Sequence, residues 1–406
     1  MSQGKSQGTN SADASDPVAV LQALIRYPSV TPDSASALDG VAAMLSGLGF
    51  QNDQPVFSAP DTPDIANLFS ALGSSAGSND PHFAFAGHLD VVPEGDVSDW
   101  THGPFSGDIE GGKLYGRGAV DMKGGVAAMI AATARFLDKH GHDFGGRLSF
   151  ILTGDEEGPA INGTDPLMQH IDAKGEKISA CLLGEPTNPE VMGEMIKIGR
   201  RGSLTATISV EGVQGHVAYP HLAANPLMPL VEALRVLKEP LDEGTDLFQP
   251  SNLEPVTIDT GNPATNIIPQ RVSARVNVRF NSNWTKASLE AELRKRLDGL
   301  GWGDEGNGCS YTLEVKQDAS EAFYTPPGPF VDSLSEAIEA ATGIKPVLST
   351  SGGTSDARFI KDYCPVVEFG LVGQTMHQVD EHVEVAHLEA LTAIYEQVLE
   401  RFFGRV

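Results

Sequence analysis

The stretch at residues 83–93, FAFAGHLDVVP, places a short apolar run directly before a histidine and an aspartate. The stretch at residues 148–158, LSFILTGDEEG, repeats this arrangement with two glutamates. Apolar runs of this length that end in glycine and polar residues are typical of buried strands that feed loops. The two stretches therefore predict a layered α/β sheet whose strand ends carry imidazole and acidic side chains.

Further apolar runs alternate along the chain with segments of helical periodicity. Predicted strands lie at residues 67–72, 83–86, 148–152, 180–183 and 366–369, and predicted helices include residues 125–137, 331–341 and 388–402. Alternation of this kind is typical of α/β sheets covered by helices. We expect one large, discontinuous domain formed by residues 17–199 and 317–406.

The segment between, residues 200–316, follows a different order of elements. It reads as strand 203–210, helix 226–238, strand 254–260, strand 271–280, helix 286–297 and strand 311–315. Within residues 271–280 apolar and polar residues alternate, which is the period of a strand with one solvated face. The order β-α-β-β-α-β predicts an inserted, ferredoxin-like α+β module.

The composition of the chain limits the kinds of binding partner and the cellular compartment that we expect for it. A chain of 406 residues fits two domains, and its formal net charge of −26 argues against a nucleic-acid or anionic-membrane partner. Cys181, Cys309 and Cys364 are far apart and form no CxxC pair, so a reducing cytoplasm suits them. No run approaches 18 apolar residues, which predicts a soluble protein, and the polar residues 1–16 read as a disordered leader.

Histidine and acidic side chains recur where the predicted strands end. The set comprises His88, Asp90, Asp121, Glu156, Glu157, Glu185 and His377. The carboxyl ends of strands form the ligand-binding edge of an open α/β sheet, so we expect these side chains to converge in one crevice. Each residue alone is more often a solvated charge or a turn former. A shared functional site is favoured because all members of the set lie in loops at the ends of predicted strands.

The charge of this set predicts bound metal. Five carboxylates in one cleft cannot all stay ionised unless cations compensate them. Two divalent ions supply a charge of +4 and leave about −1, whereas one ion would leave about −3. Imidazoles and carboxylates without thiolates suit zinc, cobalt or manganese better than calcium or magnesium. We therefore expect two divalent metal ions, with Zn²⁺ favoured and Co²⁺ as an alternative.

The motifs around these residues resemble a known superfamily. Four motifs resemble, in order and spacing, those of the co-catalytic metal-dependent deacylases and exopeptidases: GHLDVVP, YGRGAVDMKGG, GDEEG and LLGEPT. This superfamily includes aminoacylase, acetylornithine deacetylase and the glutamate-releasing carboxypeptidases. Within it, IKIGRRGS, GHVAYPHLAANP, NIIP and SGGTSDARF resemble the succinyl-diaminopimelate desuccinylases of bacterial lysine and diaminopimelate biosynthesis. The resemblance implies a metallohydrolase catalytic domain with an inserted dimerisation or lid domain.

The resemblance also implies a ligand set. His88, Asp121 and Glu185 would hold one metal, and Asp121, Glu157 and His377 the other, so that Asp121 bridges them. It further implies a cis peptide bond after Asp121.

Catalytic roles follow from the same resemblance. Asp90 would accept the second ring N–H of His88 and fix its tautomer. Glu156 would be the general base for a metal-activated water and would then protonate the departing amine. Adjacent residues of a strand point to opposite faces, so Glu156 and Glu157 can share one site only where the backbone turns.

Substrate contacts are implied as well. Succinyl-diaminopimelate carries three carboxylates, for which Arg200 and Arg279 resemble guanidinium clamps, whereas either arginine alone would more often be solvated. His216 resembles an oxyanion-stabilising histidine that acts across a dimer interface in many relatives. Neutral hydrogen bonds to the substrate would come from Asn266, Thr354 and Ser355.

Two rival functions stay open at this point. An acetylornithine deacetylase, or another N-acyl amino acid deacylase, would use the same dinuclear site but needs no cation for a succinyl carboxylate. The pair Gly373 and Gln374, where close relatives tend to have asparagine, leaves acyl and amine specificity open. A non-catalytic metal-binding protein on this fold is the second rival, and the presence of Glu156 argues against it.

Overall fold

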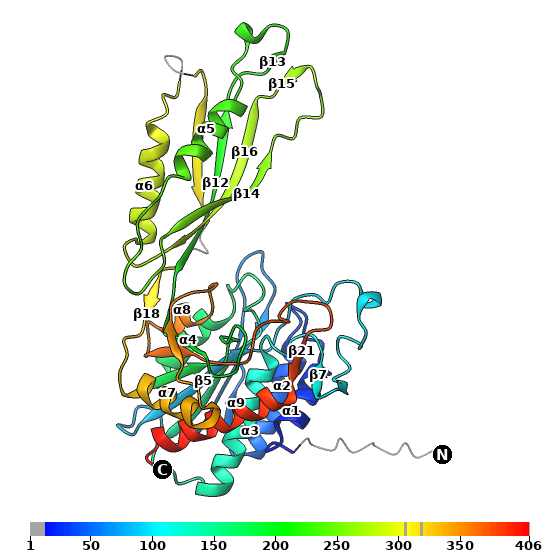
Figure 1. Cartoon of the computed structure of the whole chain (residues 1–406), viewed down its shortest axis with the longest axis vertical. Coiled ribbons are helices and arrows are strands. Elements are labelled where there is room, and N and C mark those ends of the chain that lie inside the picture. Colours follow the sequence, from blue (N-terminus) through cyan, green and yellow to red (C-terminus); the bar gives the residue numbers. More distant parts are fainter. Residues whose placement is uncertain (1–12, 304–306, 317–319, 406) are drawn as a thin grey trace. The chain divides into compact units, whose positions relative to one another are not determined.

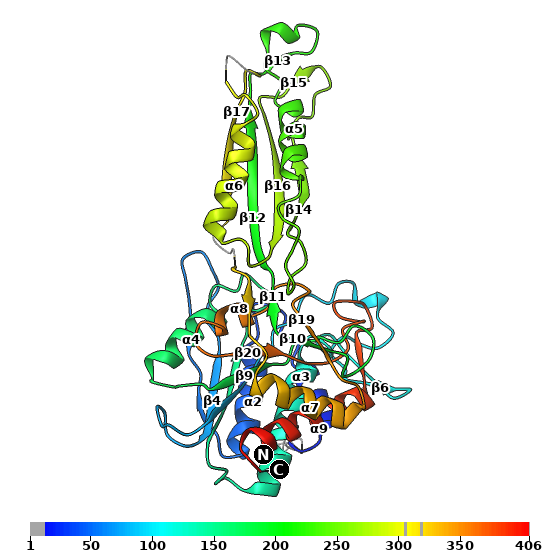
Figure 2. The same cartoon turned by 60° about the vertical axis from the view of Figure 1, so that its left-hand side comes forward.

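The chain divides into two compact units, each of which is described by itself (Figures 1 and 2). The computed structural model describes residues 13–303, 307–316 and 320–405. The first unit runs through Ile198 and continues in Thr325–Ser349 and Ser355–Val406, and the second consists of Gly199–Tyr324 and Thr350–Thr354. Residues 1–12 of the predicted leader lie outside the described residues.

The inserted segment is longer than the predicted 200–316. It ends at Tyr324 because strand β18 (Phe323–Tyr324) pairs antiparallel with β11 (Gly199–Arg200), where the second unit begins. Strands of two residues show no periodicity, so a sequence pattern could not place this boundary.

An eight-stranded mixed sheet forms the centre of the first unit. In spatial order its strands are β1 (Gln51–Asp53), β4 (Leu68–Gly73), β8 (Arg147–Thr153), β5 (His82–His88), β9 (Ala180–Leu183), β20 (Val366–Glu368), β10 (Met195–Lys197) and β19 (Val347–Ser349). β8, β5, β9 and β20 are parallel neighbours, and all four are almost entirely buried. The predicted strands of the large domain are thus confirmed, and the carboxyl ends of the four parallel strands share one edge, whereas β4 runs antiparallel to β8.

Helices cover both faces of this sheet. The crossover from β5 to β8 contains α3 (Lys123–His140), and the return crossover from β8 to β9 contains α4 (Thr164–Ala173). The two crossovers run in opposite directions along the sheet, so right-handed connections place their helices on opposite faces. The remaining helices of this unit are α1 (Pro17–Ile25), α2 (Ala35–Gly47), α7 (Pro329–Thr342), α8 (Ala357–Ile360) and α9 (Val385–Phe402). α1 and α9 pack on α3, α7 packs on α9, and α8 packs on α4, which gives the predicted layers.

Short strands complete the first unit. β2 (Val56–Phe57) pairs with β3 (Ile65–Ala66), and β21 (His382–Glu384), β7 (Lys113–Tyr115) and β6 (Ile109–Glu110) form a three-stranded sheet. A 3-10 turn lies at Val97–Asp99. Within the described residues, no helix has the length and apolar character needed to cross a membrane.

The second unit is a four-stranded antiparallel sheet with two helices. Its strands lie in the order β14 (Asn252–Asp259), β16 (Arg271–Phe280), β12 (Gly202–Glu211) and β17 (Ser310–Val315), and its helices are α5 (Leu227–Leu237) and α6 (Lys286–Asp298). This arrangement confirms the ferredoxin-like module. β13 (Gly215–His216) pairs with β15 (Ile267–Ile268), and a 3-10 turn, Pro220–Leu222, follows β13.

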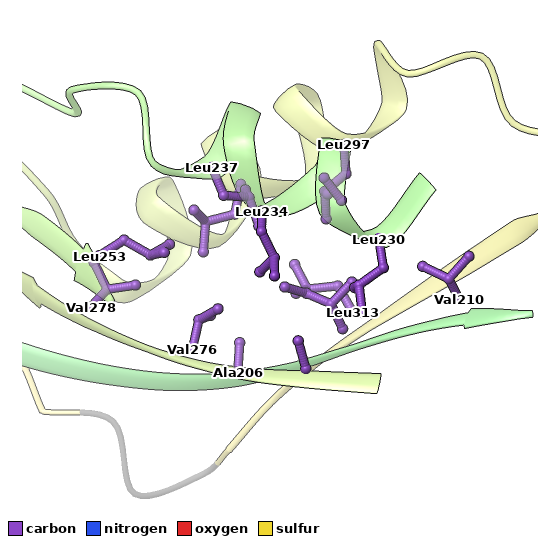
Figure 3. Packing of buried hydrophobic residues seen from close by; sticks show 14 of the residues in the cluster. Ala206, Val210, Leu230, Leu234, Leu237, Leu253, Val276, Val278, Leu297 and Leu313 are labelled. Carbon is purple, nitrogen blue, oxygen red and sulfur yellow. The ribbon is translucent and has the colours of Figure 1, made fainter. Parts of the chain in front are cut away.

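The core of the second unit lies between its sheet and its helices (Figure 3). Val276 and Val278 of β16 lie on the side of the sheet that the helices cover, where Leu230, Leu234 and other leucines of the helices also lie, and all are buried. The intervening residues of β16 are polar and partly or fully exposed. The alternation read from the sequence therefore corresponds to one apolar and one solvated face.

Candidate metal centre

His88 is the last residue of β5 and is 1% exposed. Its Nδ1 lies 2.9 Å from the backbone carbonyl oxygen of Asp90. A carbonyl can only accept, so Nδ1 carries a hydrogen, and Nε2 is the ring nitrogen that faces the neighbouring carboxylates. Nε2 lies 3.2 Å from Asp121 Oδ1 and 3.9 Å from Glu185 Oε1, and it can therefore serve as a metal ligand.

Asp121 lies between two imidazoles. Its Oδ1 faces His88 Nε2 at 3.2 Å, and its Oδ2 faces His377 Nε2, also at 3.2 Å. The carboxylate thus presents one oxygen to each ring. The peptide bond between Asp121 and Met122 is cis, as the resemblance implied. Burial opposes ionisation here, but hydrogen bonds with His377 and His88 hold the pKa of Asp121 well below its usual range.

Two further carboxylates complete the cluster. Glu157 Oε1 lies 2.8 Å from His377 Nε2, and Glu185 follows β9. His88, Asp121 and Glu157 each offer a ligand atom, and these atoms lie within 4.8 Å of one another. Burial, and then the charge of Asp121, raise the pKa of Glu185 well above its usual value. Its Oε1 is buried and has no hydrogen-bond partner among the described residues.

Asp90 differs from the role that the resemblance implied. The ring of His88 donates to the Asp90 carbonyl, and the nearest carboxylate oxygen, Oδ1, is 3.6 Å away. The Asp90 carboxylate instead accepts hydrogen bonds from the backbone N–H groups of Glu156 at 3.2 Å and Glu157 at 3.0 Å. A buried anion beside two consecutive N–H groups stabilises the turn that follows β8. This is the turn that Glu156 and Glu157 need in order to share one site.

Glu156 lies beside the cluster and is partly exposed. Desolvation, and then the negative charges of Asp356 and Asp121, raise its pKa well above the usual value, against the opposing effect of His88. A carboxylate with a raised pKa is a stronger proton acceptor, which is the property of a general base.

The cluster fits divalent metal ions. Two ligand atoms of a tetrahedral zinc site are about 3.3 Å apart, because each lies about 2.0–2.1 Å from the ion. The two distances between Asp121 and the imidazoles are both 3.2 Å. Hydrogen bonds with Asp121 and Glu157 also raise the pKa of His377 to about 10, which shows that these carboxylates stabilise positive charge between them. Imidazole and carboxylate donors suit the metals expected from the sequence.

One buried carboxylate beside this cluster is absent from the set predicted from the sequence. Glu381 is fully buried, and its Oε1 accepts from the N–H groups of Val120 at 2.9 Å and Asp121 at 3.2 Å. Its Oε2 accepts from Arg117 at 2.8 Å. An acidic residue in a glycine-poor loop reads as a solvated charge, so the sequence carried no signal for this burial.

The other predicted site residues are distributed over the two units. Ser355 is in the first unit, where its Oγ donates to Glu368 at 2.5 Å. Arg200, His216, Asn266, Arg279 and Thr354 are in the second unit. His216 and Asn266 lie close together, because β13 pairs with β15 and the carbonyl of Asn266 accepts from Val217 N–H at 3.1 Å.

Comparisons with known proteins give the chain a family. The sequence model of peptidase family M20/M25/M40 matches residues 84–401. A succinyl-diaminopimelate desuccinylase of Methylorubrum extorquens (strain PA1) is 58% identical over 388 residues, which is 95% of this chain and 99% of that relative.

Two solved structures share the fold. Aminopeptidase PepT from Bacillus cereus ATCC 10987 has a TM-score of 0.75 at 19% identity, and the match covers 97% of this chain and 100% of the PepT chain. A Bacillus subtilis protein described as a dinuclear metal binding peptidase has a TM-score of 0.69 at 15% identity, with 97% and 99% covered. These comparisons confirm the predicted α/β metallohydrolase fold and the resemblance to the succinyl-diaminopimelate desuccinylases. The chain belongs to peptidase family M20/M25/M40.

Proposed function

We propose that this protein hydrolyses N-succinyl-LL-2,6-diaminopimelate to succinate and LL-2,6-diaminopimelate, a step in lysine and diaminopimelate biosynthesis. The identity of 58% to a desuccinylase over nearly the full chain supports this substrate. One observation carries the chemistry: the carboxylate of Asp121 presents one oxygen to each of two imidazoles, His88 and His377. This arrangement suits a carboxylate shared by two cations.

Two divalent metal ions are the cofactors of this proposal. His88, Asp121 and Glu185 would hold one ion, and Asp121, Glu157 and His377 would hold the other. Zn²⁺ is favoured and Co²⁺ is the alternative. When bound, such ions supply positive charge that lowers the pKa of water and polarises an amide carbonyl.

Glu156 moves the protons of the reaction in this proposal. Its carboxylate takes a proton from the attacking water and gives it to the nitrogen of the departing amine, so one residue serves as base and then as acid. The raised pKa of this carboxyl supports the role, because it favours the protonated form that has to donate to the amine. Asp90 is a positioning residue, because it holds the N–H groups of the turn that carries Glu156.

Five residues are proposed to act on the acyl group and the substrate carboxylates. They are Arg200, His216, Asn266, Arg279 and Ser355, and Thr354, the neighbour of Ser355 in the sequence, is proposed as a sixth. Within the second unit, Arg200 donates to the carbonyl of Ser351 at 3.5 Å. A Cβ on Gly352 would lie 2.4 Å from Arg200 NH1, so this glycine allows the guanidinium to approach the loop. A guanidinium held in this way is suited to bidentate binding of a carboxylate.

A homodimer formed through the second unit is part of the proposal. α5 exposes Met228 at 68% and Val231 at 53%, and the edge strand β14 exposes Val256 at 55% and Ile258 at 56%. An edge strand with exposed β-branched residues favours pairing with another copy. Light scattering checks this, and a monomer at micromolar concentration would contradict it.

A cytoplasmic location completes the proposal. The three cysteines are buried free thiols, which suits a reducing compartment.

The substrate is tested by comparing turnover of succinyl-diaminopimelate and acetylornithine by the purified, zinc-loaded protein. The same comparison is made with the variant Arg279→Gln, which lacks the guanidinium. A succinyl carboxylate needs a cation, whereas an acetyl group does not. We expect a strong preference for the succinyl substrate, and loss of that preference in the variant. Preference of the wild-type protein for acetylornithine would overturn the substrate assignment.

A further inference from the structure

The Glu381 side chain forms hydrogen bonds with the backbone at Asp121. It is 0% exposed and lies in the short segment between His377 and β21. One carboxylate oxygen accepts from the backbone N–H groups of Val120 and Asp121, at 2.9 and 3.2 Å. Because these bonds reach the backbone of Asp121 itself, displacement of Glu381 would change where the Asp121 carboxylate lies.

Arg117 extends this link to the segment that carries His377. Its Nη1 donates to Glu381 Oε2 at 2.8 Å and to the carbonyl of Gln378, the residue after His377, at 3.1 Å. Arg117 is 3% exposed, and its guanidinium carbon lies 5.1 Å from the centre of the Trp100 ring. One buried ion pair therefore joins the two segments whose side chains meet in the cluster.

The segment that carries His377 needs such a support. His377 has φ of 62° and Asp380 has φ of 58°, both in the left-handed region that non-glycine residues seldom adopt. Such conformations persist only where the surrounding structure holds them. Asp380 Oδ1 accepts from Thr101 N–H at 2.8 Å, the carbonyl of Glu381 accepts from Gly116 N–H at 2.8 Å, and the Arg117–Glu381 pair adds a buried side-chain attachment.

We propose that Glu381, together with Arg117, is a positioning residue of the metal centre that fixes the spacing between Asp121 and His377. The inference rests on the proposed dinuclear site. The carboxylate accepts from two N–H groups through one oxygen and from a guanidinium through the other. An amide in its place would turn an N–H₂ group toward one of these donors, which leaves buried groups unpaired.

Glu381→Gln tests the proposal, and Glu384→Gln is the matched control. Glu384 lies in β21, pairs with Lys113 at 3.6 Å and has a side chain that is 41% exposed. Three measurements apply to the purified chain: titration of metal-free protein with Zn²⁺, the visible spectrum with Co²⁺, and amide hydrogen exchange of residues 118–121 and 377–382 without metal. Exchange reports on the two segments whether or not metal binds.

In the Glu381→Gln variant we expect Zn²⁺ affinity to fall about 10–100-fold, as is typical when a group that orients a ligand is lost. The Co²⁺ spectrum should change, and exchange in both segments should rise at least about tenfold over wild type. Glu384→Gln should match wild type in all three measurements. A folded Glu381→Gln protein with wild-type affinity, spectrum and exchange would overturn the proposal.

Arg117→Lys provides a second route if Glu381→Gln fails to fold. Lysine keeps the charge but lacks the planar group that reaches both Glu381 and Gln378. We expect faster exchange at residues 377–382 and weaker Zn²⁺ binding, and wild-type values for both would overturn the positioning role. Failure of the wild-type protein to take up two Zn²⁺ ions would instead overturn the proposed dinuclear site, so the two failures are distinguishable.

Discussion

The core of the second unit and the metal-ligand loops of the first are stabilised in different ways. In the second unit, apolar side chains such as Leu230 and Val276 fill the space between a sheet and two helices. In the loops, the buried groups include Asp90, Asp121 and Glu381, each held by hydrogen bonds to particular N–H groups or imidazoles. Apolar burial has no preferred direction, whereas a buried carboxylate needs a partner at a fixed place. Substitutions in the apolar core of the second unit should therefore lower stability, and substitutions in the metal-ligand loops of the first unit should change metal binding or catalysis.

The largest expected effect is on catalysis, in Glu156→Gln. Removal of the proposed base should lower kcat by about 10³-fold, because a positioned proton acceptor contributes about 10²–10⁴-fold. The metal ligands are untouched, so two Zn²⁺ ions should still bind, and the urea unfolding midpoint should stay close to that of wild type. Steady-state kinetics and elemental analysis check both expectations. Unchanged turnover would refute the role of Glu156 as base.

Leu230→Ala should produce the largest change in stability without a change in chemistry. Leu230 is 1% exposed in the core of the second unit, and truncation of a buried leucine costs about 2–5 kcal/mol of unfolding free energy. The control is Leu247→Ala, also in the second unit, where the leucine is 47% exposed and little change is expected. Urea unfolding measures both. Equal midpoints for the two variants would contradict the apolar account of this core.

The same contrast explains what the sequence could predict. The alternation in residues 271–280 coincides with β16, because one face of that strand packs on helices and the other is solvated. The apolar run 148–152 lies within β8, Arg147–Thr153. Such elements follow from side-chain periodicity and burial, which local sequence records directly.

The parts that sequence analysis missed depend on contacts between distant residues. Glu381 bonds to Asp121 across 260 positions, and Arg117 bonds to Glu381 across 264. Neither residue differs in local pattern from a solvated charge. Asp90 was expected to accept from the ring of His88. Its carboxylate lies 3.6 Å from that ring and also accepts from the N–H groups of Glu156 and Glu157, contacts that span 66 and 67 residues.

The need of a buried polar side chain for particular partners also predicts a pH effect, at a residue that lies outside both regions. His82 opens β5 in the first unit, is 2% exposed and lies 2.8 Å from Ser149 Oγ. Burial, and then the charge of Arg147, lower its pKa from 6.5 to about 4. Between these values the unfolded chain binds more protons than the folded chain, so stability falls as the pH falls from about 6.5 to about 4.

His82→Gln should remove this dependence, because an amide does not titrate and can still bond to Ser149. The wild-type protein should lose about 2 kcal/mol of unfolding free energy between pH 7 and pH 5 through His82, and the variant should lack that loss. Urea unfolding of both proteins at the two pH values gives the difference. An identical loss in wild type and variant would show that His82 is not its source.

The smallest effect is expected at Glu232→Gln on α5. Both oxygens of Glu232 accept from Arg235, at 2.7–3.0 Å, but the two side chains are 48% and 61% exposed. Water replaces the lost bonds at such a site, and salt screens the attraction, so exposed pairs contribute little. The urea midpoint should match wild type at low and at high salt. A loss comparable to that of Leu230→Ala, two residues earlier on the same helix, would mean that α5 depends on charge rather than on its buried leucines, and the contrast between the two regions would fail.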